Sequence, residues 1–291
     1  MQKKWGRGEE KLREISAEII TERVSKACID ANCILNDDIR EKIENGRLHE
    51  SYELGKDILI KLIENADYAK EKMIPICQDT GMAVVFVEIG QDVHVVGGNI
   101  EDAINNGIKD GYEKGYLRKS VVAHPIKRIN TNDNTPGVIH YEIVSGENLK
   151  ITVCPKGFGS ENMSALKMLV PADGEQGVID FVLETVKNAG SNPCPPIVVG
   201  VGIGGTMEKA AILAKKALAR SLDTKNNYEY ESKLEKILLE KINNLNIGPQ
   251  GLGGKTTALA VNVETYPTHI AGLPVAVNIN CHVTRHVEVN I

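Results

Sequence analysis

The chain has 291 residues, of which 42% are hydrophobic and 25% are charged, and its formal net charge is −5. This length and composition predict one large globular domain or two smaller ones and exclude a disordered chain. The acidic balance, without a long basic run, argues against nucleic-acid binding. No apolar run approaches the roughly 18 residues that span a membrane, so no membrane segment is expected.

The N-terminal stretch 1–7 is basic but leads into charged residues, which excludes a secretory signal peptide. Six cysteines without close pairing fit free thiols or metal ligands better than disulfides. We therefore expect a cytoplasmic protein.

Residues 1–72 are predicted to form a helical N-terminal segment. Over 9–27, apolar residues recur every three to four positions, and 51–70 repeats the pattern. Both apolar stripes must be buried against another part of the protein.

Residues 73–291 are predicted to form an α/β region with mixed-sheet layers and flanking helices, unless the whole of 1–291 is one continuous domain. Short β-branched runs predict strands at 84–88, 93–97, 138–144, 150–154 and 197–202. Helical patterns separate them at 100–117, 177–189, 207–222 and 228–245. The alternation over 283–291 predicts a last strand, either an edge that meets a partner or an ordinary strand of the domain.

Three cysteines far apart in sequence, Cys77, Cys194 and Cys281, each lie in a turn marked by glycine, proline or asparagine. This pattern suits three thiolates that hold one iron–sulfur cluster and leave one iron open. An open iron binds a substrate oxygen and acts as a Lewis acid instead of an electron carrier.

Residues 197–206 match a GxGxxG pattern through Gly200, Gly202 and Gly205, after a predicted strand and before a predicted helix. A dinucleotide site would need an acidic partner about 20 residues later, which is Asp223 at the end of the helix. The same strand, glycines and helix equally make a generic anion site for a carboxylate. We therefore keep a dinucleotide-binding protein as a distant alternative.

Two further glycine loops are present. The loop 248–256 resembles a phosphate-binding loop but has Pro249 where that motif needs glycine, which argues against nucleotide hydrolysis. The loop Lys156-Gly-Phe-Gly-Ser-Glu-Asn162 brings backbone amides and hydroxyl groups together, although a turn with Ser160 as helix N-cap would explain it equally well.

With these sequence motifs in this order, the chain resembles the class I, iron–sulfur-dependent fumarate hydratases and the related L-tartrate dehydratases, specifically their alpha subunit. The resemblance covers nearly the whole chain. It rests on Ile76-Cys-Gln-Asp-Thr-Gly81, on the 156–162 loop, on 194–205, on 248–253 and on the segment from His269 to Cys281. It implies a 4Fe-4S cluster held by Cys77, Cys194 and Cys281, and a hydro-lyase that interconverts fumarate and L-malate.

The resemblance also implies substrate contacts at Gln78, Asp79, Arg118 and His269. Hydration of a four-carbon dicarboxylate needs a Lewis acid, clamps for two carboxylates and a proton acceptor. Arg118 can grip one carboxylate, and amides of the Gly157, Gly159 and Ser160 loop or of the 200–205 loop can hold the other. Asp79 and His269 are the catalytic candidates.

The family's C-terminal half supplies further site residues, which come from a beta chain in two-subunit members. We therefore expect a hetero-oligomer that is active only with a beta subunit. Fumarate is the favoured substrate because the 156–162 loop looks more like the fumarate version, and L(+)-tartrate is the alternative.

Two other classes of protein make different demands on the cysteines. An electron-transfer protein would carry a fully ligated cluster and a compact Cys-x-x-Cys run, which this chain lacks. A zinc-stabilised module would need four ligands, with His282 or His286 joining the cysteines. Cys28, Cys33 and Cys154 are expected to be buried structural thiols.

Overall fold

The computed structural model describes residues 12–291 and divides into two compact units. The first comprises the described part of Met1–Ile29 together with Ala83–Val153 and Val287–Ile291. The second comprises Asp30–Met82 and Cys154–His286. The chain is a mixed α/β protein with N-terminal helices and mixed sheets flanked by helices, which confirms the predicted fold class.

The first unit packs helices on a small sheet. Its four strands run in the order β10-β5-β2-β4, and β1 and β3 form a separate parallel pair. The strands are β1 (Arg13–Ser16), β2 (Met82–Gly90), β3 (Val93–Val96), β4 (Val138–Val144), β5 (Leu149–Lys156) and β10 (Val287–Asn290). Buried side chains of α1 (Ala17–Cys33) and α4 (Ile100–Lys114) pack with those of β2 and β5 in one core.

The predicted helix 9–27 is wrong at its start. Residues 13–16 form a strand instead of the start of a helix, because they pair in parallel with Val93–Val96 and this pairing overrides the local helical pattern. Residues 9–11 of the predicted helix lie outside the described residues. The last strand is β10, which pairs antiparallel with β5 and forms an edge of its sheet.

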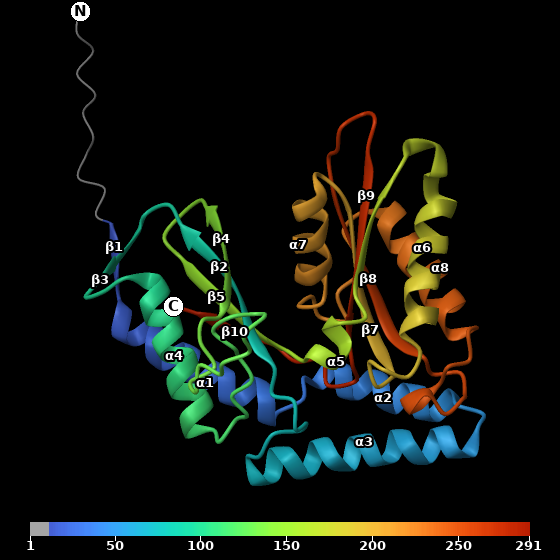
Figure 1. Cartoon of the computed structure of the whole chain (residues 1–291), viewed down its shortest axis with the longest axis horizontal. Helices are drawn as coiled ribbons and strands as arrows, with labels where there is room; N and C mark the ends of the chain where they lie inside the picture. Colours follow the sequence, from blue (N-terminus) through green and yellow to red (C-terminus); the bar gives the residue numbers. More distant parts are fainter. Residues whose placement is uncertain (1–11) are drawn as a thin grey trace, which may run out of the picture. The chain divides into compact units, whose positions relative to one another are not determined.

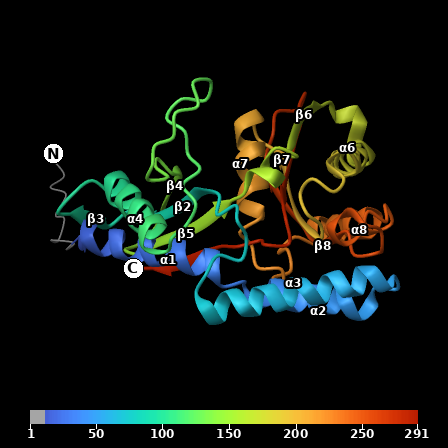
Figure 2. The same cartoon turned by 60° about the horizontal axis from the view of Figure 1, so that its bottom comes forward.

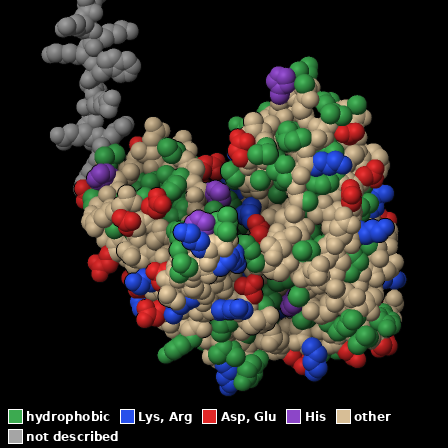
Figure 3. Space-filling view, viewed as in Figure 1, with side chains coloured by type: hydrophobic (Ala, Val, Ile, Leu, Met, Phe, Trp, Pro, Cys, Tyr) green, Lys and Arg blue, Asp and Glu red, His purple; other side chains and the backbone are tan. Residues whose placement is uncertain are grey.

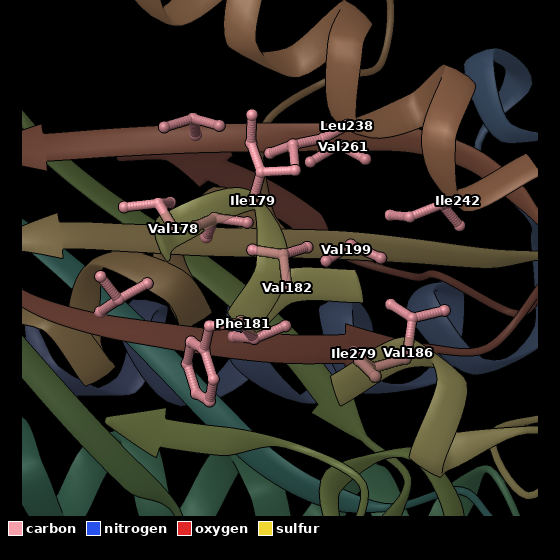
Figure 4. Close-up of a cluster of buried hydrophobic side chains, with 14 of the residues drawn as sticks. Val178, Ile179, Phe181, Val182, Val186, Val199, Leu238, Ile242, Val261 and Ile279 are labelled. Atoms are coloured by element: carbon pink, nitrogen blue, oxygen red, sulfur yellow. The ribbon is translucent and has the colours of Figure 1, made fainter. Parts of the chain in front are cut away.

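The second unit has a four-stranded sheet in the order β6-β9-β7-β8. Its strands are β6 (Ala165–Leu169), β7 (Ile197–Gly204), β8 (Ala258–Tyr266) and β9 (Leu273–Asn280). Helices α6 (Gly174–Ala189) and α8 (Glu229–Asn243) cover one face, and α7 (Met207–Ala217) covers the other (Figure 1). Valine, isoleucine and leucine side chains fill the space between the sheet and the α6–α8 layer (Figure 4).

Helices α2 (Asp37–His49) and α3 (Glu53–Lys72) lie side by side at one end of this sheet (Figures 1 and 2). Their buried side chains, among them Ile39, Ile43 and Leu59, pack with Val198 and Leu259 at the starts of β7 and β8. The remaining short elements are α5 (Phe158–Glu161), η1 (Pro171–Asp173) and η2 (Pro249–Gly251). The same end of the sheet also carries cysteine-containing loops.

The glycines of the GxGxxG pattern serve helix packing. Gly200 and Gly202 lie inside β7, where an added Cβ would meet the backbone oxygens of Ala214 and Ala210 at 2.1 and 2.0 Å. The missing side chains therefore let α7 lie directly on the strand. A dinucleotide-binding motif needs its first glycines in the loop that follows the strand. Gly200 and Gly202 lie within the strand itself, which argues against the dinucleotide interpretation.

Candidate active site

The sheet register places two of the three cysteines at one edge. Cys194 lies in the loop before β7, and Cys281 directly follows β9. These strands are antiparallel neighbours with Val198 opposite Asn280, so the start of β7 adjoins the end of β9. Two cysteines that are 87 positions apart in the sequence are thereby brought to one end of the sheet.

Hydrogen bonds join these loops. His282 Nδ1 lies 3.0 Å from the carbonyl oxygen of Cys194, and because a carbonyl only accepts, Nδ1 is the donor. Gln250 Nε2 donates to the carbonyl oxygen of Pro195 at 2.9 Å. Burial lowers the pKa of His282, which favours the neutral ring. His282 therefore connects the two cysteine loops through its side chain.

Cys77 lies in the turn between α3 and β2, in the same unit as the other two. Its side chain and that of Cys281 pack against one hydrophobic cluster. Burial raises the pKa of Cys194 and of Cys281, and the nearby charge of Cys77 raises both further. The Asp79 carbonyl oxygen in the Cys77 turn also accepts a hydrogen bond from Arg285, four residues after Cys281, which places the Cys77 turn next to the Cys281 turn.

Asp79 joins the Cys77 turn to the 156–162 loop. One carboxylate oxygen accepts a hydrogen bond from the Phe158 amide at 2.9 Å, and the other accepts one from the Gly81 amide at 3.0 Å. Gly81 has φ +74°, and an added Cβ would lie 2.6 Å from backbone atoms of Lys156. Only glycine fits this close approach, which holds the carboxylate against the loop.

The other candidates from this turn and loop are close by. Gln78 is exposed, and its Oε1 lies 3.5 Å from the Cys77 sulfur. Gly157 lies against the Asp79 carboxylate, so that an added Cβ would be 3.2 Å from it. Ser160 is buried and donates from its hydroxyl to the Gly157 carbonyl, and Gly159 is exposed. The N-cap of α5 is Gly157, so the alternative explanation of Ser160 as the cap is wrong.

Two buried cations beside the cysteines were missed in the sequence. Lys156 is 4% exposed, and its ammonium donates to Ser160 Oγ and to the Ile279 carbonyl, each at 2.9 Å. Burial lowers the pKa of Lys156 to about 8, against the opposing effect of the Glu161 carboxylate. Arg285 is also 4% exposed. The motif string contains Lys156, but burial of a charged side chain leaves no mark in a local sequence pattern.

Two further predicted site residues, His269 and Arg118, belong to other segments of the chain. His269 is exposed in the loop that connects β8 to β9, whereas Cys281 follows the other end of β9. The eight residues of that strand span about 23 Å, so one chain does not bring His269 beside its own cysteines. Arg118 is exposed in the first unit, just after α4.

The remaining cysteines are mostly inaccessible. Cys28 and Cys33 are buried, as expected, whereas Cys154 is only half-buried. Burial raises the pKa of Cys28 and of Cys154 to about 12, so both remain neutral thiols at neutral pH.

The donor set suits an anionic cluster better than a single ion. Across residues 12–291, no three His, Cys, Asp or Glu side chains lie close enough together to hold one metal ion. In an iron–sulfur cluster each cysteine binds a different iron, which allows wider sulfur spacing. Buried Lys156 and Arg285 both lower the pKa of Cys281, and Arg285 Nη1 has no hydrogen-bond partner. Three thiols beside two buried cations therefore fit a group of negative charge.

The loop 248–256 that resembles a phosphate-binding loop holds a carboxylate of the chain itself. Glu50, which is 2% exposed, accepts hydrogen bonds from the amides of Lys255 and Thr256 at 2.8 and 2.9 Å. Burial alone would raise the pKa of Glu50, but these bonds outweigh burial and hold its pKa below the usual value. The amides that would bind a phosphate are thus already engaged.

We expect Glu50→Gln to lower the free energy of unfolding by about 2–3 kcal/mol at pH 7, because it weakens several charge-assisted hydrogen bonds. The folded-state pKa lies below the unfolded value of about 4.3, so this stability is present above that pH. It is lost as the pH falls through the folded pKa. Urea unfolding at a series of pH values measures the difference. The control is Glu44→Gln, which breaks only a surface pair with Arg47, and an equal loss in both variants would contradict the prediction.

Acidic and basic side chains are interspersed on the face shown in Figure 3. Among the described helices, none combines the length and the apolar character that crossing a bilayer requires.

Comparisons with known proteins agree with the motifs. A model of the fumarate hydratase family matches residues 21–290. The protein named "Putative L(+)-tartrate dehydratase subunit alpha" of Methanocaldococcus jannaschii is 44% identical over 264 residues, which are 88% of this chain and 92% of that protein. The L(+)-tartrate dehydratase subunit alpha of Escherichia coli K12 is 31% identical over 270 residues, with 91% and 88% covered.

Proposed function

This chain belongs to the class I fumarate hydratase and L-tartrate dehydratase family of hydro-lyases, and from that premise we propose that it is the alpha subunit of an iron–sulfur enzyme acting on a four-carbon dicarboxylic acid. The observation that carries the proposal is that hydrogen bonds join the turns of Cys77, Cys194 and Cys281 in one unit, and that Asp79 lies in the first of these turns. Free thiols of this kind suit the reducing cytoplasm, where we place the protein.

In this proposal Cys77, Cys194 and Cys281 hold a 4Fe-4S cluster. When bound, the cluster supplies a Lewis acid at its open iron. Asp79 accepts or delivers the proton of the carbon that reacts, and its two amide hydrogen bonds keep its carboxylate oriented. Gln78 donates a neutral hydrogen bond to the substrate.

The substrate's carboxylates need positive or N–H partners. We propose that Arg118 grips one of them and that the Gly157, Gly159 and Ser160 loop holds the other. The catalytic role of His269 stays a prediction, and within one chain β9 separates it from the cysteines. The proposed site therefore also uses residues from outside the Asp79 turn and the 156–162 loop.

The relatives named above are alpha subunits, so we propose a hetero-oligomer whose beta subunit completes the site. We expect the purified chain to be inactive alone and active after co-expression with the beta subunit, when both are prepared without oxygen. Aeration should abolish activity, because loss of the open iron removes the Lewis acid. Turnover by the chain alone at the rate of the complex, or activity unchanged by prolonged aeration, would contradict this proposal.

Two substrates compete within the proposal. The 156–162 loop resembles the fumarate version, whereas the relatives are named for L(+)-tartrate. Measurement of kcat/KM for fumarate, L-malate and L(+)-tartrate on one preparation of the complex decides between them. The true substrate is expected to exceed the other by more than tenfold, because a site built to bind a second hydroxyl rejects an analogue that lacks it.

A further inference from the structure

Arg285 occupies an unusual position for a buried arginine. It lies in the second unit, four residues after Cys281, and is 4% exposed. Its Nη2 donates to the carbonyl oxygen of Asp79, and its Nε donates to the carbonyl oxygen of Pro155 at 3.4 Å. Its Nη1 is buried without a hydrogen-bond partner. Both bonds go to neutral carbonyl groups, so neither acceptor supplies a negative charge to the guanidinium group.

The two carbonyl bonds connect separate parts of the candidate site. Asp79 belongs to the turn that carries Cys77, and Pro155 lies near the end of β5, next to Lys156. The segment that carries Arg285 is itself tied back to Cys281, because Thr284 Oγ1 donates to the Cys281 carbonyl at 2.9 Å. Arg285 thus fixes the Cys77 turn to the Cys281 turn, although no strand pairing joins the two.

The charge of Arg285 is buried beside the Cys281 turn, and its Nη1 has no hydrogen-bond partner there. A buried cation is costly unless negative charge compensates it. Three thiolates bound to a cluster would provide that negative charge, and the open Nη1 is a donor for it.

We propose that Arg285 is a positioning residue for the iron–sulfur cluster: it holds the Cys77 and Cys281 turns together and supplies a buried positive charge to the cluster. This inference rests on the proposed function, because it requires the cluster to bind. Nearby charges and hydrogen bonds set the reduction potential of iron–sulfur clusters and their retention of metal. Arg285 is therefore expected to affect both properties without touching the substrate.

The test uses the alpha–beta complex, loaded with iron and sulfide without oxygen, as wild type, Arg285→Gln and Arg285→Lys. Iron and acid-labile sulfide per complex, the rate of iron loss in air and the cluster potential by electron paramagnetic resonance titration are measured. For Arg285→Gln we expect a more negative potential and iron loss at least several-fold faster. For Arg285→Lys we expect a potential near wild type but fast iron loss, because lysine keeps the charge without the planar fork.

Arg220→Gln is the matched control. Arg220 is a largely buried arginine of the same unit, but it pairs with Glu235 and Glu264 and not with a cysteine turn. Its loss should lower stability while leaving the potential and iron retention unchanged. A potential and iron-loss rate in both Arg285 variants equal to wild type would overturn this inference alone. A wild-type complex that takes up no cluster would overturn the proposed function and this inference together. If Arg285→Gln does not fold, Arg285→Lys still decides through its iron loss.

Discussion

Cys281→Ser is expected to remove the cluster and to lower activity by far more than the roughly 10–100-fold cost of losing an outer partner of a metal site. The serine hydroxyl is a poor replacement, because iron–sulfur clusters are held by soft thiolates. Cys281 is the most informative of the three proposed ligands, because it lies at a strand end beside the segments that carry the buried cations Lys156 and Arg285. The measurement is iron and sulfide per complex, visible absorption and kcat after preparation without oxygen.

Cys154→Ser is the matched control for this prediction. Cys154 lies in the same unit but within β5, outside the three turns that carry the proposed ligands. The variant should keep its cluster and its kcat. If Cys281→Ser retained iron equal to wild type, or if Cys154→Ser lost as much, the proposed ligand set would be wrong.

The sequence predicted most regular elements of this fold because their apolar patterns are strong. The predicted helix 100–117 corresponds to α4 (Ile100–Lys114), and the predicted strand 150–154 lies within β5 (Leu149–Lys156). Residues 13–16 were assigned incorrectly, because their pairing partner lies about 80 positions away and no local pattern reveals it. Helix α2 lies within the predicted helical segment 1–72, but its own bounds were not predicted, since it contributes only Ile39 and Ile43 to the core among many charged residues.

The sequence likewise predicted some features of the candidate site and missed others. Glycine, proline or asparagine residues mark the turns around Cys77, Cys194 and Cys281, so the sequence alone was enough to identify these turns. Their convergence depends on the register of β7 against β9 and on the carbonyl bonds of Arg285, neither of which is a local property. Lys156 and Arg285 were missed for that reason, since only the tertiary structure shows that these charges are buried.

Asp79→Asn is expected to lower kcat by about 10²–10⁴-fold, the usual contribution of a proton-transferring side chain, while iron and sulfide content stay at the wild-type level. Asparagine keeps the size of the side chain and one oxygen that can accept the hydrogen bond from Phe158 or Gly81. What it loses is the ability to take up a proton. The measurement is kcat on the preferred substrate together with the cluster content of the same samples.

The control separates proton transfer from loop positioning, because Asp79 also anchors the 156–162 loop. Phe158→Pro removes the amide donor to Asp79 at the first position of α5, where proline is tolerated, and Phe158→Ala accounts for the lost ring. If Asp79 acts mainly by holding the loop, Phe158→Pro should lower kcat as much as Asp79→Asn does. If Asp79 transfers the proton, Phe158→Pro should cost only a small fraction of that loss, because a missing neutral tether leaves an intact carboxylate beside the cluster turn.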